Sequence, residues 1–216
     1  MQTLLIANGE LNRGAMLDRL LRLLDSPRVI CADGGALQAR ALGLKPQTII
    51  GDLDSLSPQQ VADFAAAGVE ILRYPPEKDE TDLELALHHC RSIGAKEVHI
   101  LGGLGGRYDQ TLANILLLAH PAFRGLRVDF VDGDQQVRLL PPGRHHVRGG
   151  RGDTVSLIPL GAAAEGITTR GLRYRLDGEP LQLGPARGIS NVMLEEEVTI
   201  VLRAGLLLLV HTLGRA

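Results

Sequence analysis

The sequence predicts a two-domain fold, in which an α/β domain with a parallel sheet precedes a small antiparallel β-sandwich domain. Three observations support this expectation. Short apolar runs alternate with helical patterns in the first two-thirds of the 216 residues, the helical patterns stop after about Asp132, and turn residues then recur at short intervals. We therefore expect the α/β domain to span residues 1–133 and the all-β domain to span residues 134–216.

Six apolar runs are the predicted strands of the first domain, and leucines at helical spacing between them predict the covering helices. Ser57-Pro58 has the composition of an N-cap followed by a first-turn proline, and Thr81 stands before Glu84 at capping-box spacing. Glycines that follow helical stretches are expected C-caps. The expected strands are Thr3–Ala7, Arg28–Cys31, Thr48–Ile50, Val69–Arg73, Val98–Leu101 and Arg127–Val131, and the expected C-caps are Gly43, Gly68 and Gly94.

The second domain is expected to consist of short strands separated by tight turns. Glycine and proline mark the turns, for example at Pro141-Pro142-Gly143 and at Asp177-Gly178. The tripeptide Arg151-Gly152-Asp153 matches a cell-adhesion sequence and is interpreted as a chance match at a hairpin. The expected strands include Thr154–Ile158, Leu172–Leu176, Val198–Leu202 and Leu206–Val210.

Composition and charge exclude several classes of protein. Hydrophobic residues make up 44% and charged residues 22%, and the formal net charge is −2, which argues against disorder and against nucleic-acid binding through bulk charge. No apolar run near the carboxyl end approaches the ~20 residues of a membrane helix. The apolar amino terminus stops at Asn8 without a basic segment before it, and Cys31 and Cys90 are expected to be buried free thiols. We expect a soluble, cytoplasmic protein with no nucleic-acid or membrane partner.

Four polar motifs each follow a predicted strand of the first domain. The carboxyl ends of parallel strands lie at one edge of a sheet, where ligands of open α/β sheets bind, so these motifs are expected to converge. Four motifs at one edge indicate a ligand site more strongly than any one of them. The motifs are Asp33-Gly34-Gly35, Gly51-Asp52-Leu53-Asp54-Ser55, Lys78-Asp79-Glu80-Thr81-Asp82 and the segment Gly102–Asp109.

Three acids of these motifs are candidate metal ligands. Asp52 and Asp54 are two residues apart, so an extended segment would point both the same way, and Asp82 follows Asp54 by 28 residues, about one helix-and-strand unit. Carboxylates that converge repel one another unless a cation binds between them, and oxygen ligands alone favour Mg²⁺. For any single acid, a turn position is an equally good explanation; for the set it is a weaker one.

The segment between the fifth predicted strand and the next helix is rich in glycine. Glycine lets the backbone approach a phosphate closely, and the start of the following helix favours anions. A tight strand-to-helix turn alone would need only one or two glycines, and a solvated surface charge is the commoner role of a single lysine or arginine. The candidate phosphate-binding residues are Gly102, Gly103, Gly105 and Gly106, with Lys78 and Arg107 as sources of positive charge.

Together with a fifth motif, Gly188-Ile189-Ser190-Asn191, these segments resemble the thiamine pyrophosphokinase (thiamine diphosphokinase) family, in the same order along nearly the whole chain. The resemblance implies a Rossmann-like nucleotide domain followed by a β-sandwich that binds thiamine and mediates a homodimer. It also implies Mg²⁺-dependent transfer of the pyrophosphoryl group of ATP to the thiamine hydroxyl, which yields thiamine diphosphate and AMP.

The resemblance implies roles for individual residues as well. The three acids of the metal set would bind Mg²⁺. Asp33 is expected at the same sheet edge, where it would orient or deprotonate the attacking hydroxyl. Ser190 and Asn191 would contact the thiamine pyrimidine across the dimer interface. The implied catalytic residues are Asp33, Asp52, Asp54, Lys78 and Asp82, and the implied ATP and phosphate ligands are Lys78, Thr81, Gly102, Gly103, Gly105, Gly106, Arg107 and Asp109.

Two positions depart from the family's pattern, and alternatives stay open. Gln110 stands where the family usually has His, and Met193 stands where it commonly has Phe. The same fold could therefore serve another acceptor, such as a hydroxymethylpterin. A non-catalytic module that binds Mg-nucleotide or thiamine is a second alternative, which the intact acids oppose. A dinucleotide-dependent oxidoreductase has little support, because Asn8-Gly9-Glu10 lacks the expected glycine run.

Overall fold

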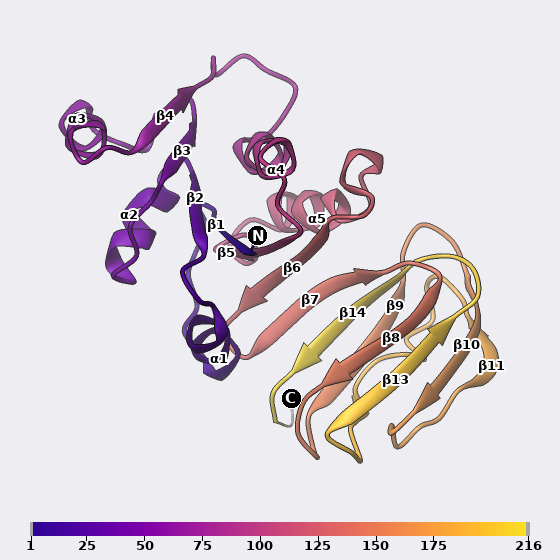
Figure 1. The fold of residues 1–216 in the computed structure, drawn as a ribbon. Helices are drawn as coiled ribbons and strands as arrows, with labels where there is room; N and C mark the ends of the chain where they lie inside the picture. The colour runs from indigo at the N-terminus through magenta and orange to yellow at the C-terminus, as the bar shows by residue number, and fades with distance from the viewer. Residues whose placement is uncertain (1, 215–216) are drawn as a thin grey trace. The chain divides into compact units, whose positions relative to one another are not determined.

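The computed structural model describes residues 2–214, which divide into two compact units. The first comprises the chain up to Arg13 and Asp18–Asp132, and the second comprises Gly14–Leu17 and the chain from Gly133 onward. The fold is mixed α/β, with a parallel sheet in the first unit and antiparallel strands in the second (Figure 1). Within residues 2–214, no helix has both the length and the apolar character needed to cross a membrane.

The sheet of the first unit has six parallel strands in the order β6-β5-β1-β2-β3-β4. All six runs that the sequence predicts as strands are confirmed, with small shifts at their ends. The strands are β1 (Gln2–Ile6), β2 (Arg28–Ala32), β3 (Thr48–Gly51), β4 (Glu70–Arg73), β5 (Glu97–Leu101) and β6 (Arg127–Asp132). The helices are α1 (Ala15–Leu23), α2 (Gly35–Ala41), α3 (Pro58–Ala66), α4 (Asp82–Ser92), α5 (Tyr108–Leu117) and the short 3-10 helix η1 (Pro121–Phe123).

Helices lie on both faces of this sheet. Figure 1 shows α2 and α3 on one side of strands β2 to β4 and α4 on the other. Strands covered on both faces read as continuous apolar runs, and Leu5, Ile30 and Ile100 accordingly have no exposed surface. The edge strand β4 is less buried than the strands inside the sheet. The core of the first unit is therefore the aliphatic interior of the sheet, and its chemistry lies at the strand ends.

The helix ends follow the cap signals of the sequence. Ser57 begins α3 in a reciprocal capping box with Gln60. At the start of α4, the Thr81 hydroxyl accepts a hydrogen bond from the Glu84 backbone N–H at 3.2 Å. This cap fixes where α4 begins and makes Asp82 its first residue. The expected C-cap glycines are also confirmed, because each has a positive φ: Gly43, Gly68 and Gly94.

The strand order reverses at β1, which lies between β5 and β2. The chain leaves β1 through Asn8, β2 through Asp33 and β5 through Gly102. The Gly9 N–H donates to the Gly102 carbonyl at 2.9 Å, so the loops after β1 and β5 lie side by side. Ligand crevices of open parallel sheets form where the strand order reverses. The topology therefore brings the polar motifs to one edge.

The second unit contains two antiparallel sets of strands, ordered β12-β9-β14-β7 and β11-β10-β13-β8. Side chains from both sets form one apolar cluster, which includes Leu157 and Ile200. The strands are β7 (Gln135–Leu140), β8 (Gly143–Arg148), β9 (Thr154–Pro159), β10 (Ala164–Arg170), β11 (Asp177–Leu181), β12 (Asn191–Val192), β13 (Glu197–Leu202) and β14 (Leu207–Thr212).

One predicted strand of this unit, Leu172–Leu176, is wrong. The segment forms a loop, and β11 begins at Asp177, where a turn was expected. Thr169 closes the loop, because its N–H donates to the Leu176 carbonyl and its hydroxyl accepts from the Leu176 N–H, both at 2.9 Å. Leu172 and Leu176 are buried as parts of the apolar cluster. An apolar run that fills a core from a loop has the same pattern as a strand, which explains the error.

The tripeptide Arg151-Gly152-Asp153 forms the turn before β9. The Asp153 side chain is buried and accepts hydrogen bonds from the backbone N–H groups of Gly150 at 2.7 Å and Gly214 at 2.8 Å. Its Oδ2 also lies 2.9 Å from His211 Nε2. The acid is therefore used inside the fold, as expected of a chance match to an adhesion sequence.

Candidate functional site

A cavity of about 470 Å³ opens at the carboxyl edge of the parallel sheet. Residues from the ends of β1, β2 and β5 line it, together with the segment that leads into α4. Asp33, Lys78 and Asp82 face this cavity along with the glycine-rich loop. Three of the four motifs thus line one cavity, and the fourth adjoins it through Asp52, whose carboxylate lies near those of Asp33 and Asp82.

Three carboxylates converge beside the cavity: those of Asp33, Asp52 and Asp82. One oxygen from each lies within 4.8 Å of the others. Asp33 is 4% exposed, and its Oδ1 is buried without a hydrogen-bond partner in the described part of the chain. Gly51 is required here, because it has φ +149° and a Cβ at this position would lie 3.1 to 3.2 Å from Asp82 and Asp33. A small oxygen-preferring cation fits this donor set.

Lys78 supplies the positive charge that the three acids need in this structure. Its Nζ lies 3.0 Å from Asp82 Oδ1 and 3.8 Å from Asp52 Oδ2, and it donates to the Pro75 carbonyl at 3.2 Å. Burial raises the pKa of Asp82, and the Lys78 ammonium opposes that rise. Burial lowers the pKa of Lys78, but Asp82 and Asp52 outweigh it and raise that pKa overall. The ammonium therefore stays charged and neutralises part of the cluster.

Asp54 does not belong to this cluster of described residues, although Asp52 and Asp54 were expected to point the same way. Leu53 has φ +67°, and this left-handed residue turns the backbone that the expectation took as extended. The Asp54 N–H donates to Asp52 Oδ1 at 3.1 Å, and its carboxylate accepts from the Ser55 hydroxyl at 3.1 Å. Asp33 instead supplies the third converging carboxylate.

Asn8 is a site residue that the sequence reasoning missed. Its Nδ2 donates to Asp33 Oδ2 at 3.2 Å and to the Ser55 hydroxyl at 2.8 Å, so it joins the loops after β1, β2 and β3. Asn8 also lines the cavity. The available signal was its position directly after the first strand, the same position that singled out the other motifs.

The glycine-rich loop between β5 and α5 combines packing glycines with conformational ones. A Cβ at Gly103 would lie 2.6 Å from Phe130 Cε1, so its glycine is needed for close packing. Gly105 and Gly106 have φ +90° and +65° and face open space, so their glycines are needed for backbone conformation. The Thr111 hydroxyl holds the loop through the Gly105 N–H and carbonyl, both at 3.1 Å.

Two side chains at the start of α5 pair with each other. Arg107 Nε donates to Asp109 Oδ1 at 3.1 Å, and both side chains are largely exposed. This contact raises the pKa of Arg107 and lowers the pKa of Asp109. Gln110 lines the cavity beside them. The guanidinium lies beside the glycine loop and is accessible to an anion, at the cost of its contact with Asp109.

Ser190 and Asn191 belong to the second unit, where both have structural contacts. Ser190 has φ +57° and its N–H donates to the Ser156 hydroxyl at 3.0 Å. The Asn191 amide donates to the Tyr174 carbonyl at 2.7 Å and accepts from the Tyr174 N–H at 2.9 Å. Met193 is 1% exposed and belongs to the apolar cluster. Asn191 thus organises the loop of Tyr174 with its side chain, and Met193 packs inside the unit.

Comparisons with known proteins agree on one family. The family model "Thiamin pyrophosphokinase, catalytic domain" matches residues 21–130, and "Thiamin pyrophosphokinase, vitamin B1 binding domain" matches residues 144–207. The chain is similar to "Thiamine pyrophosphokinase 1" of Oryza sativa subsp. japonica, with 32% identity over 200 residues that cover 79% of this chain and 74% of that protein. It is also similar to "Thiamine pyrophosphokinase" of Bacillus subtilis, with 28% identity over an alignment that covers 85% of this chain and 86% of that protein.

Solved structures give the same result for the fold. A crystal structure of thiamine pyrophosphokinase from Bacillus subtilis has a TM-score of 0.87 at 25% identity and covers 99% of this chain and 100% of that chain. A thiamin pyrophosphokinase family protein from Enterococcus faecalis has a TM-score of 0.85 at 25% identity, with both chains covered completely.

Proposed function

The chain belongs to the thiamine pyrophosphokinase family of transferases, and we propose that it transfers the pyrophosphoryl group of ATP to the hydroxyl oxygen of thiamine. The products are thiamine diphosphate and AMP. The observation that carries this proposal is the convergence of three carboxylates, Lys78 and a glycine-rich loop on one cavity of about 470 Å³. A triphosphate with its cation needs this combination of acids, positive charge and accessible backbone N–H groups.

Mg²⁺ fits the acidic cluster, because its donors are all oxygen and Asp33 Oδ1 is buried without a hydrogen-bond partner among the described residues. We assign Asp52 and Asp82 as ligands. Asp54 is exposed and adjoins Asp52 on the same turn, and we propose it as the third ligand. When bound, Mg²⁺ neutralises charge that develops on the phosphate oxygens.

Lys78 has two successive roles in this account. Without a bound cation, its ammonium screens Asp82 and Asp52 from each other. With a cation bound to these acids, the ammonium would be available to bind phosphate oxygens as a point charge. Arg107 exchanges Asp109 for a phosphate in the same way, because its side chain is 72% exposed.

The backbone and the remaining acid position the reactants. Gly102, Gly103, Gly105 and Gly106 approach the polyphosphate, and the N-terminal turns at Thr81 and at Asp109 contribute N–H groups near it. Asp33 orients the attacking hydroxyl, held in place by Asn8. Holding the hydroxyl in line with the β-phosphorus supplies most of the rate, since phosphoryl-type transfer depends chiefly on positioning and electrostatics.

The second unit completes the proposed enzyme. We assign residues 1–133 to a Rossmann-like catalytic domain and residues 134–216 to a β-sandwich that binds thiamine and forms a cytoplasmic homodimer. The strand order around β1 and the single apolar cluster of the second unit support the two domain types. Ser190, in an exposed bend, and Asn191, the first residue of β12, contact the thiamine pyrimidine in this proposal. Since the Asn191 side chain already bonds to Tyr174, we expect the turn's backbone and Ser190 to make much of this contact.

Acceptor specificity tests this function. Purified protein is incubated with Mg-ATP and thiamine, with hydroxymethylpterin, or with no acceptor, and AMP release is followed. We expect AMP release only in the incubation that contains thiamine as the acceptor. AMP release only in the incubation with the pterin would identify the pterin as the acceptor. ATP binding without AMP release under any condition would favour the non-catalytic module.

A further inference from the structure

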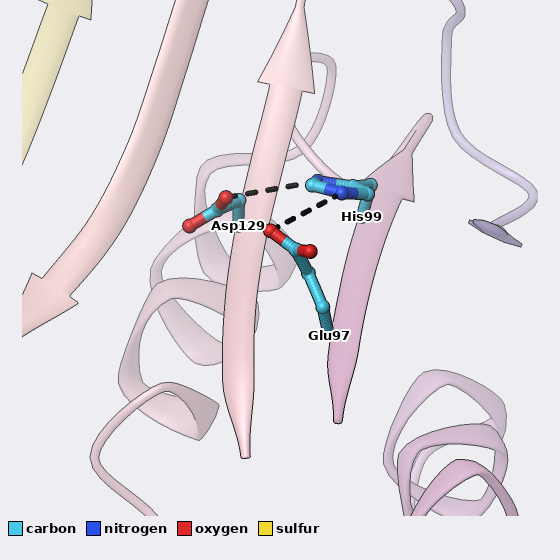
Figure 2. Close-up of side chains that lie close together, drawn as sticks. All are labelled: Glu97, His99 and Asp129. Atoms are coloured by element: carbon cyan, nitrogen blue, oxygen red, sulfur yellow. Dashed lines mark ion pairs between the residues drawn. The ribbon is translucent and has the colours of Figure 1, made fainter. Parts of the chain in front are cut away.

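A second group of charged side chains lies within the strands of the same sheet, remote in sequence from the motifs. Strands β5 and β6 pair so that His99 faces Asp129 and Glu97 faces Arg127. Facing residues of a parallel pair, and residues two apart on one strand, share a face of the sheet. Figure 2 shows Glu97, His99 and Asp129 gathered on that face, with the His99 ring directed toward both carboxylates. The intervening Val98 and Val128 are buried.

This group is more deeply buried than a surface charge cluster. The side chains of Asp129 and His99 are 0% and 6% exposed, and that of Glu97 is 23% exposed. His99 Nδ1 is 3.6 Å from Asp129 Oδ2, and His99 Nε2 is 3.6 Å from Glu97 Oε1. Both separations exceed hydrogen-bond length, and Nδ1 is buried without a hydrogen-bond partner in residues 2–214. The ring is thus aimed at two acids without being satisfied by either.

One basic side chain, Arg127, lies beside both acids of the group. Arg127 lies 3.1 Å from Glu97 Oε1 and 3.6 Å from Asp129 Oδ2, with a side chain that is 53% exposed.

We propose that Glu97, His99 and Asp129 form a second cation site, which takes Zn²⁺ or Mn²⁺ in preference to Mg²⁺. One ligand atom from each residue lies within 4.8 Å of the others. For all three ligand atoms to bind one ion at about 2.0–2.2 Å, they would have to move closer to one another. An imidazole nitrogen beside two carboxylate oxygens suits a borderline ion, whereas Mg²⁺ prefers oxygen ligands throughout.

The bound ion would join β5 to β6 within the sheet, and β5 leads directly into the glycine-rich loop. Arg127 would compete with the ion for the two acids and turn toward solvent when the ion binds. The site requires no substrate and stands whether or not the chain transfers pyrophosphate.

Zn²⁺ titration in excess Mg²⁺ tests the site, because Mg²⁺ occupies the all-oxygen cluster. Calorimetry and metal analysis after dialysis measure stoichiometry and affinity for the full-length protein. We expect one Zn²⁺ equivalent that Mg²⁺ does not displace. Glu97→Gln should weaken this binding at least about tenfold, since even indirect partners of a metal change affinity by that much. Glu84→Gln is the matched control, because Glu84 also lies near two histidines, His88 at 4.0 Å and His120 at 3.9 Å.

Arg127→Gln is expected to change Zn²⁺ affinity in the opposite direction. Removing the competing guanidinium should tighten Zn²⁺ binding several-fold, even if Asp129→Asn does not fold. Absence of Zn²⁺ binding in excess Mg²⁺, or binding that Glu84→Gln removes and Glu97→Gln leaves intact, would overturn the proposal. Loss of stability in Arg127→Gln without any gain in Zn²⁺ affinity would also overturn it and identify the group as an ion network completed by Arg127.

Discussion

Two groups of acids in one parallel sheet meet the same electrostatic problem in different ways. Asp33, Asp52 and Asp82 sit on loops at the strand ends, beside a cavity, with Lys78 between two of them. Glu97 and Asp129 sit within strands, beside a buried histidine. Carboxylates that gather must be neutralised, and each group recruits one basic side chain of the chain itself.

The two groups differ in whether a ligand can reach their acids. The first group is built on segments after the strands, so a ligand can reach it and Lys78 can exchange partners. The second group is fixed by strand register, and its acids are 0% and 23% exposed. A cavity of about 470 Å³ adjoins the first group, whereas the second group lies within two paired strands.

Removal of an acid from the first group should have the largest effect. Asp82→Asn should lower turnover by about 10³-fold, or about 4 kcal/mol of transition-state stabilisation, because cation and phosphate charge are then less well compensated. AMP release and a thermal melt measure activity and folding. Glu97→Gln should retain activity within a few-fold. Equal losses in both variants would contradict the division between the two groups.

Loss of the lysine between the acids should have the next largest effect. Lys78→Met should lower turnover about 10²-fold, because a phosphate ligand is lost. It also leaves Asp82 and Asp52 without their internal cation, so added Mg²⁺ should raise the melting temperature more than in the wild type. Lys45→Met, at an exposed lysine outside the site, serves as control. An unchanged response to Mg²⁺ would show that Lys78 does not screen these acids.

Gly103 of the glycine-rich loop lies close to the second group of acids, because it packs on Phe130, the neighbour of Asp129. Gly103→Ala should cost about 1–3 kcal/mol of unfolding free energy, since the new Cβ would meet the aromatic ring at 2.6 Å. Urea denaturation measures the loss. Combining it with Phe130→Leu should cost less than the sum of the two changes, and strict additivity would contradict the contact.

Asp153 is a buried acid whose charge is stabilised by hydrogen bonds. Burial raises its pKa, but hydrogen bonds from Gly214, Gly150 and His211 outweigh this and hold the pKa below its usual range. A lowered folded-state pKa stabilises the protein above the unfolded pKa of about 3.9, and this stability is lost as pH falls through the folded value.

Asp153→Asn should therefore cost about 1–2 kcal/mol at neutral pH and flatten the acid limb of the stability profile. Urea melts between neutral pH and pH values below 4 test this, with the exposed Asp177→Asn as control. A parallel shift of the whole profile would show that the effect is not ionisation of Asp153.

Features set by residues close together in the sequence were easier to predict than features set by contacts between distant residues. The strands of the first unit were predictable because burial on both faces makes them continuous apolar runs. The turn between Asp52 and Asp54 was not foreseen, because one left-handed residue, Leu53, redirects the chain and apolar spacing does not report φ. Leu172–Leu176 was misassigned because burial from a loop resembles burial from a strand.

Contacts between distant segments were the hardest to foresee. His99 and Asp129 are 30 positions apart and meet only through the pairing of β5 with β6. The available signal was the charge-valine-charge alternation at 97–99 and at 127–129, which interrupts two otherwise apolar strands.

The central claim is attack on the β-phosphorus of ATP by the thiamine hydroxyl. The most direct measurement is chromatography of the products formed by the wild-type protein from Mg-ATP and thiamine. We predict thiamine diphosphate and AMP in equal amounts. Thiamine monophosphate with ADP would place the attack at the γ-phosphorus and contradict the account.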